Sequence, residues 1–217
     1  MLALVPAAAA MSITSLAGAQ TDADPDSTEE SAVTKRASLR SKIVLRVTRN
    51  VRSGRTVVAR GRVWPHTANR RVSLRLSGRK IRTVRVSDSG RFRIRWKAPG
   101  SGVYRAVAIA HRTGTATADR SGAKRINVFR PALASYYGPG FYGGTTACGK
   151  TLQPGMLGVA NKELPCGSTV TLRHSGRTIT VRVIDRGPYS GYREYDLTEA
   201  TKEKLRFGST GTVLTTR

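Results

Sequence analysis

The chain has 217 residues, with 38 Lys and Arg against 13 Asp and Glu, two Cys and 6% aromatic residues, a length that suits one large domain or two small ones. The apolar content of 39% is too low for a bundle of membrane helices, and no segment after the N-terminal residues approaches the ~20 apolar residues of a membrane-spanning helix. Short alternating groups of Val, Ile and Leu exclude a wholly disordered chain.

The chain begins with nineteen small and apolar residues, and Ala17-Gly18-Ala19 has the A-x-A form of a signal-peptidase site. We interpret residues 1–19 as a signal peptide cleaved near Ala19, which predicts a secreted protein of the cell envelope. A disordered Ala-rich leader is the alternative. Residues 20–37 contain five acidic and two basic residues and almost no large apolar side chain, so they are expected to form a disordered acidic linker.

Residues 38–130 contain 25 Lys and Arg against two acidic residues, and therefore hold nearly all the excess charge. Apolar and polar residues alternate in runs separated by Gly, Ser, Asn and Pro, which predicts about seven strands with one dry face each. The clearest dry faces are those of Ile43, Leu45 and Val47, of Val72, Leu74 and Leu76, and of Phe92, Ile94 and Trp96. We expect a two-sheet sandwich, and Asp88-Ser89-Gly90-Arg91-Phe92 followed by Pro99-Gly100 resembles the immunoglobulin-like modules of secreted bacterial proteins.

The wet faces of these strands are rich in Arg, as Arg91, Arg93 and Arg95 illustrate. Such a face often only solubilises a protein, but mixed signs would do so with less self-repulsion, so the one-sided charge predicts a polyanionic partner. Nucleic acid is not expected, because the sequence has no zinc-ligand spacing, recognition helix or aromatic stacking platform. For an exported protein we expect the basic sandwich to bind anionic cell-wall polymers.

Cys148 and Cys166 are the two cysteines of the chain. Export to an oxidising compartment lets thiols pair, so one disulfide is expected. A catalytic Cys with a His base is the alternative, but no Cys-His signature surrounds His174, the nearest His in sequence. Because His66, His111 and His174 are isolated, we expect no metal site, and the sequence predicts no cofactor.

The C-terminal segment, residues 132–217, is richer in Gly. Runs at Ser168–Leu172 and Thr178–Ile184 predict two strands of a hairpin that turns at Ser175-Gly176. One helix is expected to begin near Asp196, in an Asp-x-x-Glu capping pattern, and to stop at Gly208.

Five short motifs follow one another in this segment. They are Ala134-Ser135-Tyr136-Tyr137-Gly138, Thr146-Ala147-Cys148-Gly149, Leu164-Pro165-Cys166-Gly167, Val183-Ile184-Asp185-Arg186-Gly187-Pro188-Tyr189 and Asp196-Leu197-Thr198. In these motifs and their order, residues 132–217 closely resemble the rare lipoprotein A (RlpA) family, which implies a six-stranded double-psi β-barrel with one short helix, related to expansins. The predicted fold is thus all-β with two domains. The paired Cys are similar to those of actinobacterial members.

The characterised members of the family are lytic transglycosylases that cut the glycan strands of peptidoglycan, and the resemblance implies this activity. One carboxyl group can protonate the leaving oxygen and then act as a base. Asp185, at the end of an apolar strand, is the first catalytic candidate, and the resemblance places Asp196 near the same groove. An Asx turn at Asp185 and a helix cap at Asp196 are the alternatives. The predicted substrate-binding residues are Thr146, Tyr136, Tyr137, Tyr189 and Arg186.

Two positions depart from the family. Lys150 stands where members typically have a Glu, and Asn161 where they have a His. Both positions are expected on the groove wall, and their replacement leaves Asp185 with fewer partners that tune its proton affinity. A non-catalytic, expansin-like glycan binder and a secreted polyanion-binding adhesin with a structural barrel therefore stay open as alternatives.

Overall fold

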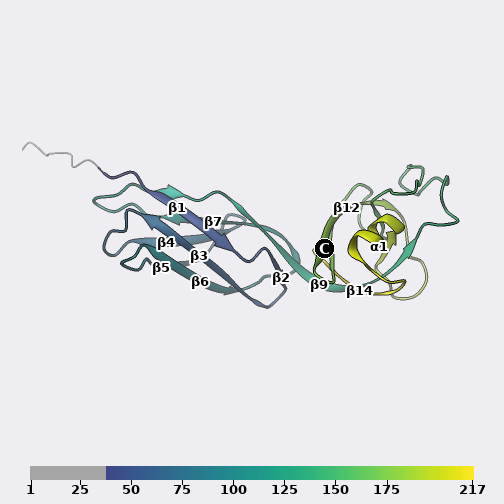
Figure 1. Ribbon diagram of the computed structural model, residues 1–217, viewed down its shortest axis with the longest axis horizontal. Coiled ribbons are helices and arrows are strands. Elements are labelled where there is room, and N and C mark those ends of the chain that lie inside the picture. Colours follow the sequence, from purple (N-terminus) through teal and green to yellow (C-terminus); the bar gives the residue numbers. More distant parts are fainter. Residues whose placement is uncertain (1–37) are drawn as a thin grey trace, which may run out of the picture. The chain divides into compact units, whose positions relative to one another are not determined.

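The computed structural model describes residues 38–217, which form fourteen β-strands and one α-helix (Figure 1). The expected signal peptide and acidic linker lie outside these residues. None of the described helices is long and apolar enough to cross a membrane. The predicted all-β fold class with one short helix is confirmed.

Two sheets enclose the N-terminal core. Their strands are β1 (Lys42–Val47), β2 (Asn50–Arg52), β3 (Thr56–Trp64), β4 (Arg71–Leu76), β5 (Arg79–Arg85), β6 (Arg91–Lys97), β7 (Gly102–Ala110), β8 (Asp119–Arg120) and the first half of β9 (Lys124–Tyr137). One sheet has the order β1-β3-β6, and the other places β5, β4, β7 and β9 side by side, with β2 on β9 and β8 on β7. This is a two-sheet arrangement, as expected; its assignment to the immunoglobulin-like class stays a prediction.

The period-two alternation decides which face each strand buries. On β6, Phe92 and Ile94 are buried whereas Arg91 and Arg93 are exposed. The buried residues of both sheets form one apolar cluster, in which β1 contributes Leu45. Burial of this surface drives the two sheets together, and it leaves the arginines of β6 on the outer face.

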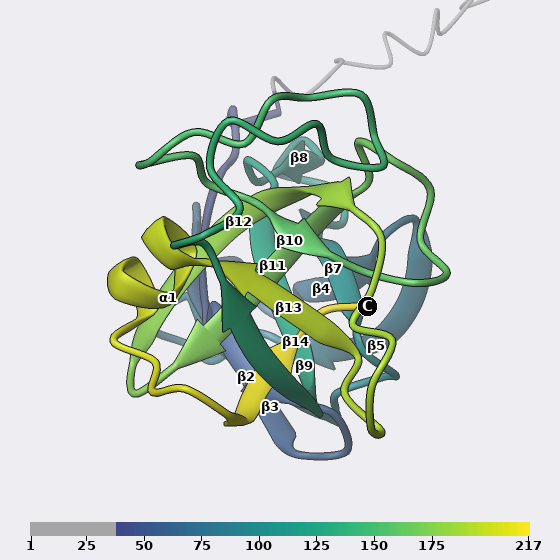
Figure 2. The ribbon, with the colours of Figure 1, turned by 90° about the vertical axis from the view of Figure 1, so that its right-hand side faces the viewer.

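Six strands close a ring in the C-terminal half: β9, β10 (Val159–Ala160), β11 (Thr169–His174), β12 (Arg177–Asp185), β13 (Tyr195–Thr198) and β14 (Gly211–Thr215). Around the ring the order is β9, β14, β11, β12, β10, β13 and back to β9 (Figure 2). The pairs β9–β13 and β10–β12 are parallel and the others are antiparallel. A closed ring with two parallel pairs fits the predicted double-psi β-barrel, and closure leaves the sheet without a free edge.

The hairpin of the barrel forms where the sequence predicts it. Ser175 and Gly176, between β11 and β12, have φ values of 42° and 80°, the positive angles that a two-residue type I′ turn requires. Gly176 has no side chain and Ser175 has a small one. The two-residue turn that they form fixes the register in which His174 pairs with Arg177.

The predicted helix is present, but it begins three residues after Asp196 and ends three residues before Gly208. Helix α1 is Glu199–Leu205, and its N-cap is Thr198, whose side-chain oxygen accepts a hydrogen bond from the N–H of Thr201. Asp196 lies within β13, where pairing with β9 and β10 keeps the chain extended until Thr198. The helix ends before Gly208 because Arg206 adopts a left-handed conformation, as C-terminal caps commonly do.

Candidate active site

An open cleft of about 190 Å³ lies at the ends of β12 and β13. It is lined by Tyr137, Phe141, Ala160, Asp185, Arg186, Gly187, Pro188, Tyr189, Ser190, Arg193 and Asp196. Both carboxylates that the sequence singles out thus line one cleft.

The pairing of three strands brings the two carboxylates together. Ala160 of β10 is the register partner of Asp185 on one side and of Asp196 on the other. Neighbouring strands lie ~4.8 Å apart, so the two aspartate Cα atoms are separated by about 10 Å across the intervening strand. Because Ala160 carries only a methyl group, space remains between the two acids.

Asp185 is held by one of its two carboxylate oxygens. Oδ1 accepts hydrogen bonds from the N–H groups of Ala147 and Arg186, each at 2.8 Å. The bond to the next residue in sequence is the local backbone contact expected of a turn-forming Asp. Within residues 38–217 no well-aligned hydrogen bond reaches Oδ2, although the Tyr137 hydroxyl lies near this carboxylate, so the structural bonds all fall on Oδ1.

Asp196 is held from the neighbouring strand. Its Oδ1 accepts a hydrogen bond from the hydroxyl of Ser135, which is its register partner on β9 and is itself buried. Ser135 is not among the site residues predicted from the sequence, although it stands within the first of the five motifs. Parallel pairing of β9 and β13, which no local pattern reveals, creates the contact.

Tyr137 contributes a hydroxyl group rather than a free ring face. Its ring packs edge-on against Phe141, with 6.2 Å between centroids, and its buried hydroxyl oxygen has no hydrogen-bond partner among the described residues. Burial, followed by the negative charges of Asp185 and Asp196, raises the pKa of Tyr137 well above its ordinary value. The phenol therefore stays protonated beside both carboxylates.

The other predicted substrate contacts divide into residues inside and outside the cleft. Tyr189 lies on its rim with 80% of its surface exposed, and Phe141, which the sequence analysis did not single out, is 63% exposed. Tyr136 packs against the barrel core beneath the Nζ of Lys202, 3.9 Å from the ring centroid. Thr146 is buried, does not line the cleft, and accepts a hydrogen bond from a neighbouring backbone N–H.

Arg186 lines the cleft, but its guanidinium group supports a loop. It donates hydrogen bonds to the carbonyl oxygens of Asn161, at 3.1 Å, and Leu164, at 2.7 Å. Charge-assisted bonds of this kind are among the stronger ones in proteins. Arg186 thus fixes the loop of residues 161–167 against the corner that carries Asp185.

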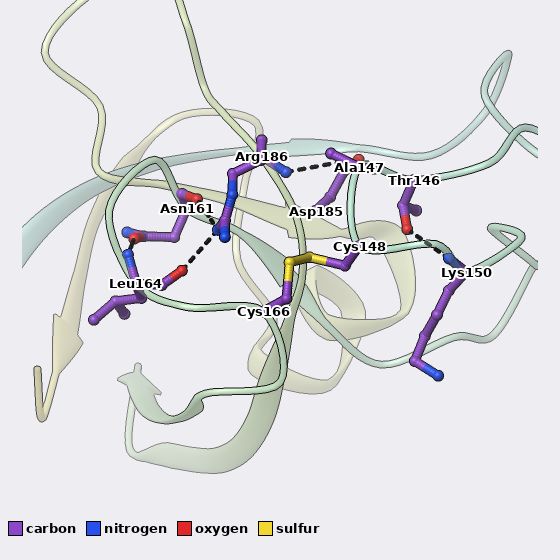
Figure 3. Close-up of a disulfide and its surroundings, with 9 residues drawn as sticks. All are labelled: Thr146, Ala147, Cys148, Lys150, Asn161, Leu164, Cys166, Asp185 and Arg186. Carbon is purple, nitrogen blue, oxygen red and sulfur yellow. Dashed lines mark hydrogen bonds between the residues drawn. A yellow bond between two sulfur atoms is a disulfide. The ribbon is translucent and has the colours of Figure 1, made fainter.

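The disulfide joins the two loops that support this corner. Cys148 and Cys166 are bonded, with a Cα–Cα distance of 5.6 Å, within the usual range, so the predicted pairing is confirmed. Cys148 follows Ala147, which donates to Asp185, and the loop of Cys166 includes the carbonyl of Leu164 that Arg186 contacts (Figure 3). The bridge thereby ties both supports to each other.

Lys150 does not line the cleft, which corrects its expected place on the groove wall, and Asn161 lines only the hollow beside the cleft. The side chain of Lys150 extends away from Asp185 (Figure 3). Asn161 is buried: its Nδ2 donates to the Glu194 carbonyl, and its Oδ1 accepts from the N–H groups of Glu163 and Leu164. Asn161 therefore organises the turn of its own loop.

A second hollow of about 370 Å³ adjoins the cleft at Arg193, which lines both. The fully exposed Tyr192 and the ion pair between Arg130 and Glu194, at 2.7 Å, lie along it.

Within residues 38–217 no group of three or more His, Cys, Asp or Glu side chains gathers to hold a metal ion.

The similarity to known protein families lies in the barrel. A double-psi β-barrel family described as "Lytic transglycolase" matches residues 131–215. The "Probable endolytic peptidoglycan transglycosylase RlpA" of Synechocystis sp. is 35% identical over 91 residues, which cover 41% of this chain and 28% of that protein. The "Endolytic peptidoglycan transglycosylase RlpA" of Campylobacter jejuni is 39% identical over 82 residues, covering 37% and 30%.

The protein of the same name from Pseudomonas aeruginosa is 41% identical over 81 residues, covering 36% of this chain and 24% of that protein. This chain thus spans less than a third of the length of these three relatives. The closed six-stranded ring, the family match and the shared identity agree: residues 131–215 form a double-psi β-barrel that is similar to the RlpA proteins.

Proposed function

We propose that the protein is a peptidoglycan lytic transglycosylase, which cleaves the bond between N-acetylmuramic acid and N-acetylglucosamine without water and leaves 1,6-anhydro-muramyl ends. The observation that carries the proposal is the pair of carboxylates, Asp185 and Asp196, lining one open cleft of an RlpA-family barrel. Detection of anhydro-muropeptides after incubation with purified sacculi tests it.

The second carboxylate oxygen of Asp185 suits the acid and base steps. In the acid form, Oδ2 donates its proton to the glycosidic oxygen as the bond from that oxygen to C1 of the muramic acid breaks. The resulting carboxylate then takes the proton of the 6-hydroxyl of the same sugar as this oxygen bonds to C1. The proton count is restored, one C–O bond replaces another, and no water is consumed.

Asp196 and the rim aromatics support this step. The carboxylate of Asp196, held by Ser135, supplies negative charge opposite Asp185, where positive charge develops on C1. The exposed rings of Tyr189 and Phe141 offer flat apolar surfaces for sugar faces. The adjoining hollow at Arg193 extends this surface for further sugar units of a glycan strand.

Tyr137→Phe tests the buried hydroxyl. We expect turnover to fall about tenfold or more, because the hydroxyl lies beside both carboxylates and can donate to one of them when substrate is bound, a charge-assisted bond that contributes roughly 1.5–3 kcal/mol. Thermal stability should stay equal or rise, since the substitution removes a buried hydroxyl that lacks a partner. A rate equal to that of the unmodified protein would exclude a role for the hydroxyl, and a loss of melting temperature would indicate a structural one.

Asp196→Asn and Thr198→Ala form a matched pair, because the two residues lie on the same strand. Thr198→Ala should lower the free energy of unfolding by about 1 kcal/mol through loss of the helix cap, with little effect on turnover. Asp196→Asn should lower turnover and leave stability nearly unchanged, since the amide oxygen still accepts the hydrogen bond of Ser135. Denaturation and rate measurements check both variants. If Asp196→Asn lowered stability and left turnover unchanged, Asp196 would have a structural role and no role in the reaction.

The proposed place of action is the cell envelope, reached after signal-peptide cleavage near Ala19. The basic sandwich then holds the enzyme on anionic wall polymers through its excess of Lys and Arg. Exposed charges are screened over ~10 Å at 0.1 M salt, so binding to sacculi should weaken steeply as salt is added.

A further inference from the structure

A wide hollow lies on the outer face of the N-terminal sandwich, away from the barrel cleft. It measures about 920 Å³, and its lining contains six arginines, no lysine and no acidic residue. The lining residues are Val44, Arg46, Arg60, Gly61, Arg62, Trp64, Arg85, Val86, Ser87, Arg91, Phe92 and Arg93. We call this hollow the arginine cleft.

Strand register places five of these arginines as direct neighbours. Arg46, Arg60 and Arg93 oppose one another across β1, β3 and β6, and Arg62 opposes Arg91 one step along the same face. Side chains in directly opposed positions have Cβ atoms ~4.5–5.5 Å apart, and like charges in such positions destabilise a sheet. The outer face of this sheet therefore carries two rows of repelling guanidinium groups.

No ion pair in the described part of the chain involves these arginines. The single ion pair within residues 38–217 is Arg130 with Glu194, which lies elsewhere. Arg62 donates to the carbonyl of Ser89 and lies 4.8 Å from the ring centroid of Trp64. The side chains of the other five arginines make no hydrogen bond with described residues. The five acidic residues of positions 20–37 are far too few to balance the sandwich.

The cleft also has an apolar component between its charges. Val44 and Trp64 are 42% and 43% exposed, although both are large apolar residues. Val44 is the register partner of Arg62, so carbon surface and charge alternate across the sheet. A ligand that alternates carbon segments with anionic groups would contact both.

We propose that the arginine cleft binds a phosphodiester-linked polyol chain, a linear polymer with one phosphate in each short repeat. A guanidinium group binds two phosphate oxygens at once, and all six cations of the cleft are of this type. Along β3 and β6 the arginines recur at every second residue, a repeat of about 6.7 Å, so a regularly charged chain can follow them. The proposal rests on the proposed envelope location and is independent of the catalytic activity.

Single-stranded nucleic acid fits the cleft less well. Proteins that bind it combine positive charge with several exposed rings on which bases stack. Trp64 is the one exposed ring in the lining, and Arg62 already lies over it, whereas Phe92 is 5% exposed. A polyol spacer needs no stacking surface.

The test measures binding of the full chain to synthetic poly(glycerol phosphate) at low and at high salt. Replacement of Arg46, Arg60 and Arg93 by Gln should weaken binding at least about tenfold, since three charge contacts and their counterion release are lost. The melting temperature should rise, because the repulsion within the row is relieved. The matched control replaces Arg55, Arg112 and Arg120 by Gln, which removes the same charge at exposed positions outside the cleft.

An equal loss of affinity in both triple variants would overturn the proposal in favour of diffuse charge attraction. Equally tight binding of polygalacturonate or of single-stranded DNA would overturn the phosphodiester assignment. Cleavage of glycan strands stripped of other wall polymers should be the same in both triple variants and the unmodified protein. A failure of the proposed catalytic function would appear in that last measurement and leave the binding result intact.

Discussion

Asp185→Asn is expected to abolish the formation of anhydro-muramyl ends, with a loss of about 10²–10⁴-fold in rate if proton transfer is the term removed. The amide keeps the shape of the side chain, and its oxygen still accepts from the N–H groups of Ala147 and Arg186. Stability should therefore change little. Muropeptide analysis by mass spectrometry gives the rate, and thermal denaturation gives the stability.

Glu203→Gln is the control for Asp185→Asn, because it makes the same chemical change at an exposed position of α1. Its turnover should equal that of the unmodified protein. A fully active Asp185→Asn protein would show that another group supplies the proton. An Asp185→Asn protein that no longer folds would show instead that the bonds to Ala147 and Arg186 require the charged carboxylate.

Removal of the disulfide is expected to have the second largest effect. Replacing Cys148 and Cys166 by Ser should lower the free energy of unfolding by ~3 kcal/mol. This value applies because the two residues are 18 positions apart, so the bridge closes a short loop and restricts the unfolded chain. Turnover should also fall, because the loop that carries Ala147 is then free to move away from Asp185.

Reducing agent provides the matching control for the disulfide. It should lower the activity and the melting temperature of the unmodified protein and leave those of the double Ser variant unchanged. Urea denaturation curves and glycan-cleavage rates measure both effects. Full activity of the reduced protein at temperatures well below its melting transition would show that the bridge stabilises the barrel without positioning Asp185.

The features predicted from sequence are those encoded locally. Alternation in Phe92, Ile94 and their Arg neighbours determines a wet and a dry face without knowledge of the partner strand. The Ser175-Gly176 turn needs only two residues that accept positive φ. The pairing of Cys148 with Cys166 follows from their number, given an oxidising compartment.

The features that the sequence did not reveal depend on strand register. Ser135 reaches Asp196 only because β9 and β13 are parallel neighbours. The helix cap at Thr198 differs from the predicted one because pairing of Asp196 in β13 overrides a capping pattern that is favourable by itself. The opposed arginines of β1, β3 and β6 are likewise visible only once the strands are aligned.

The most direct measurement of the central proposal is mass spectrometry of the products released from purified sacculi by the full chain. Lytic transglycosylase activity predicts muropeptides with 1,6-anhydro-muramyl ends, which are lighter than the hydrolysed form by the mass of about one water. The Asp185→Asn protein should release no such products. Binding of the protein to sacculi without any anhydro ends, across the range from acidic to neutral pH, would contradict the proposal and leave a non-catalytic, expansin-like glycan binder.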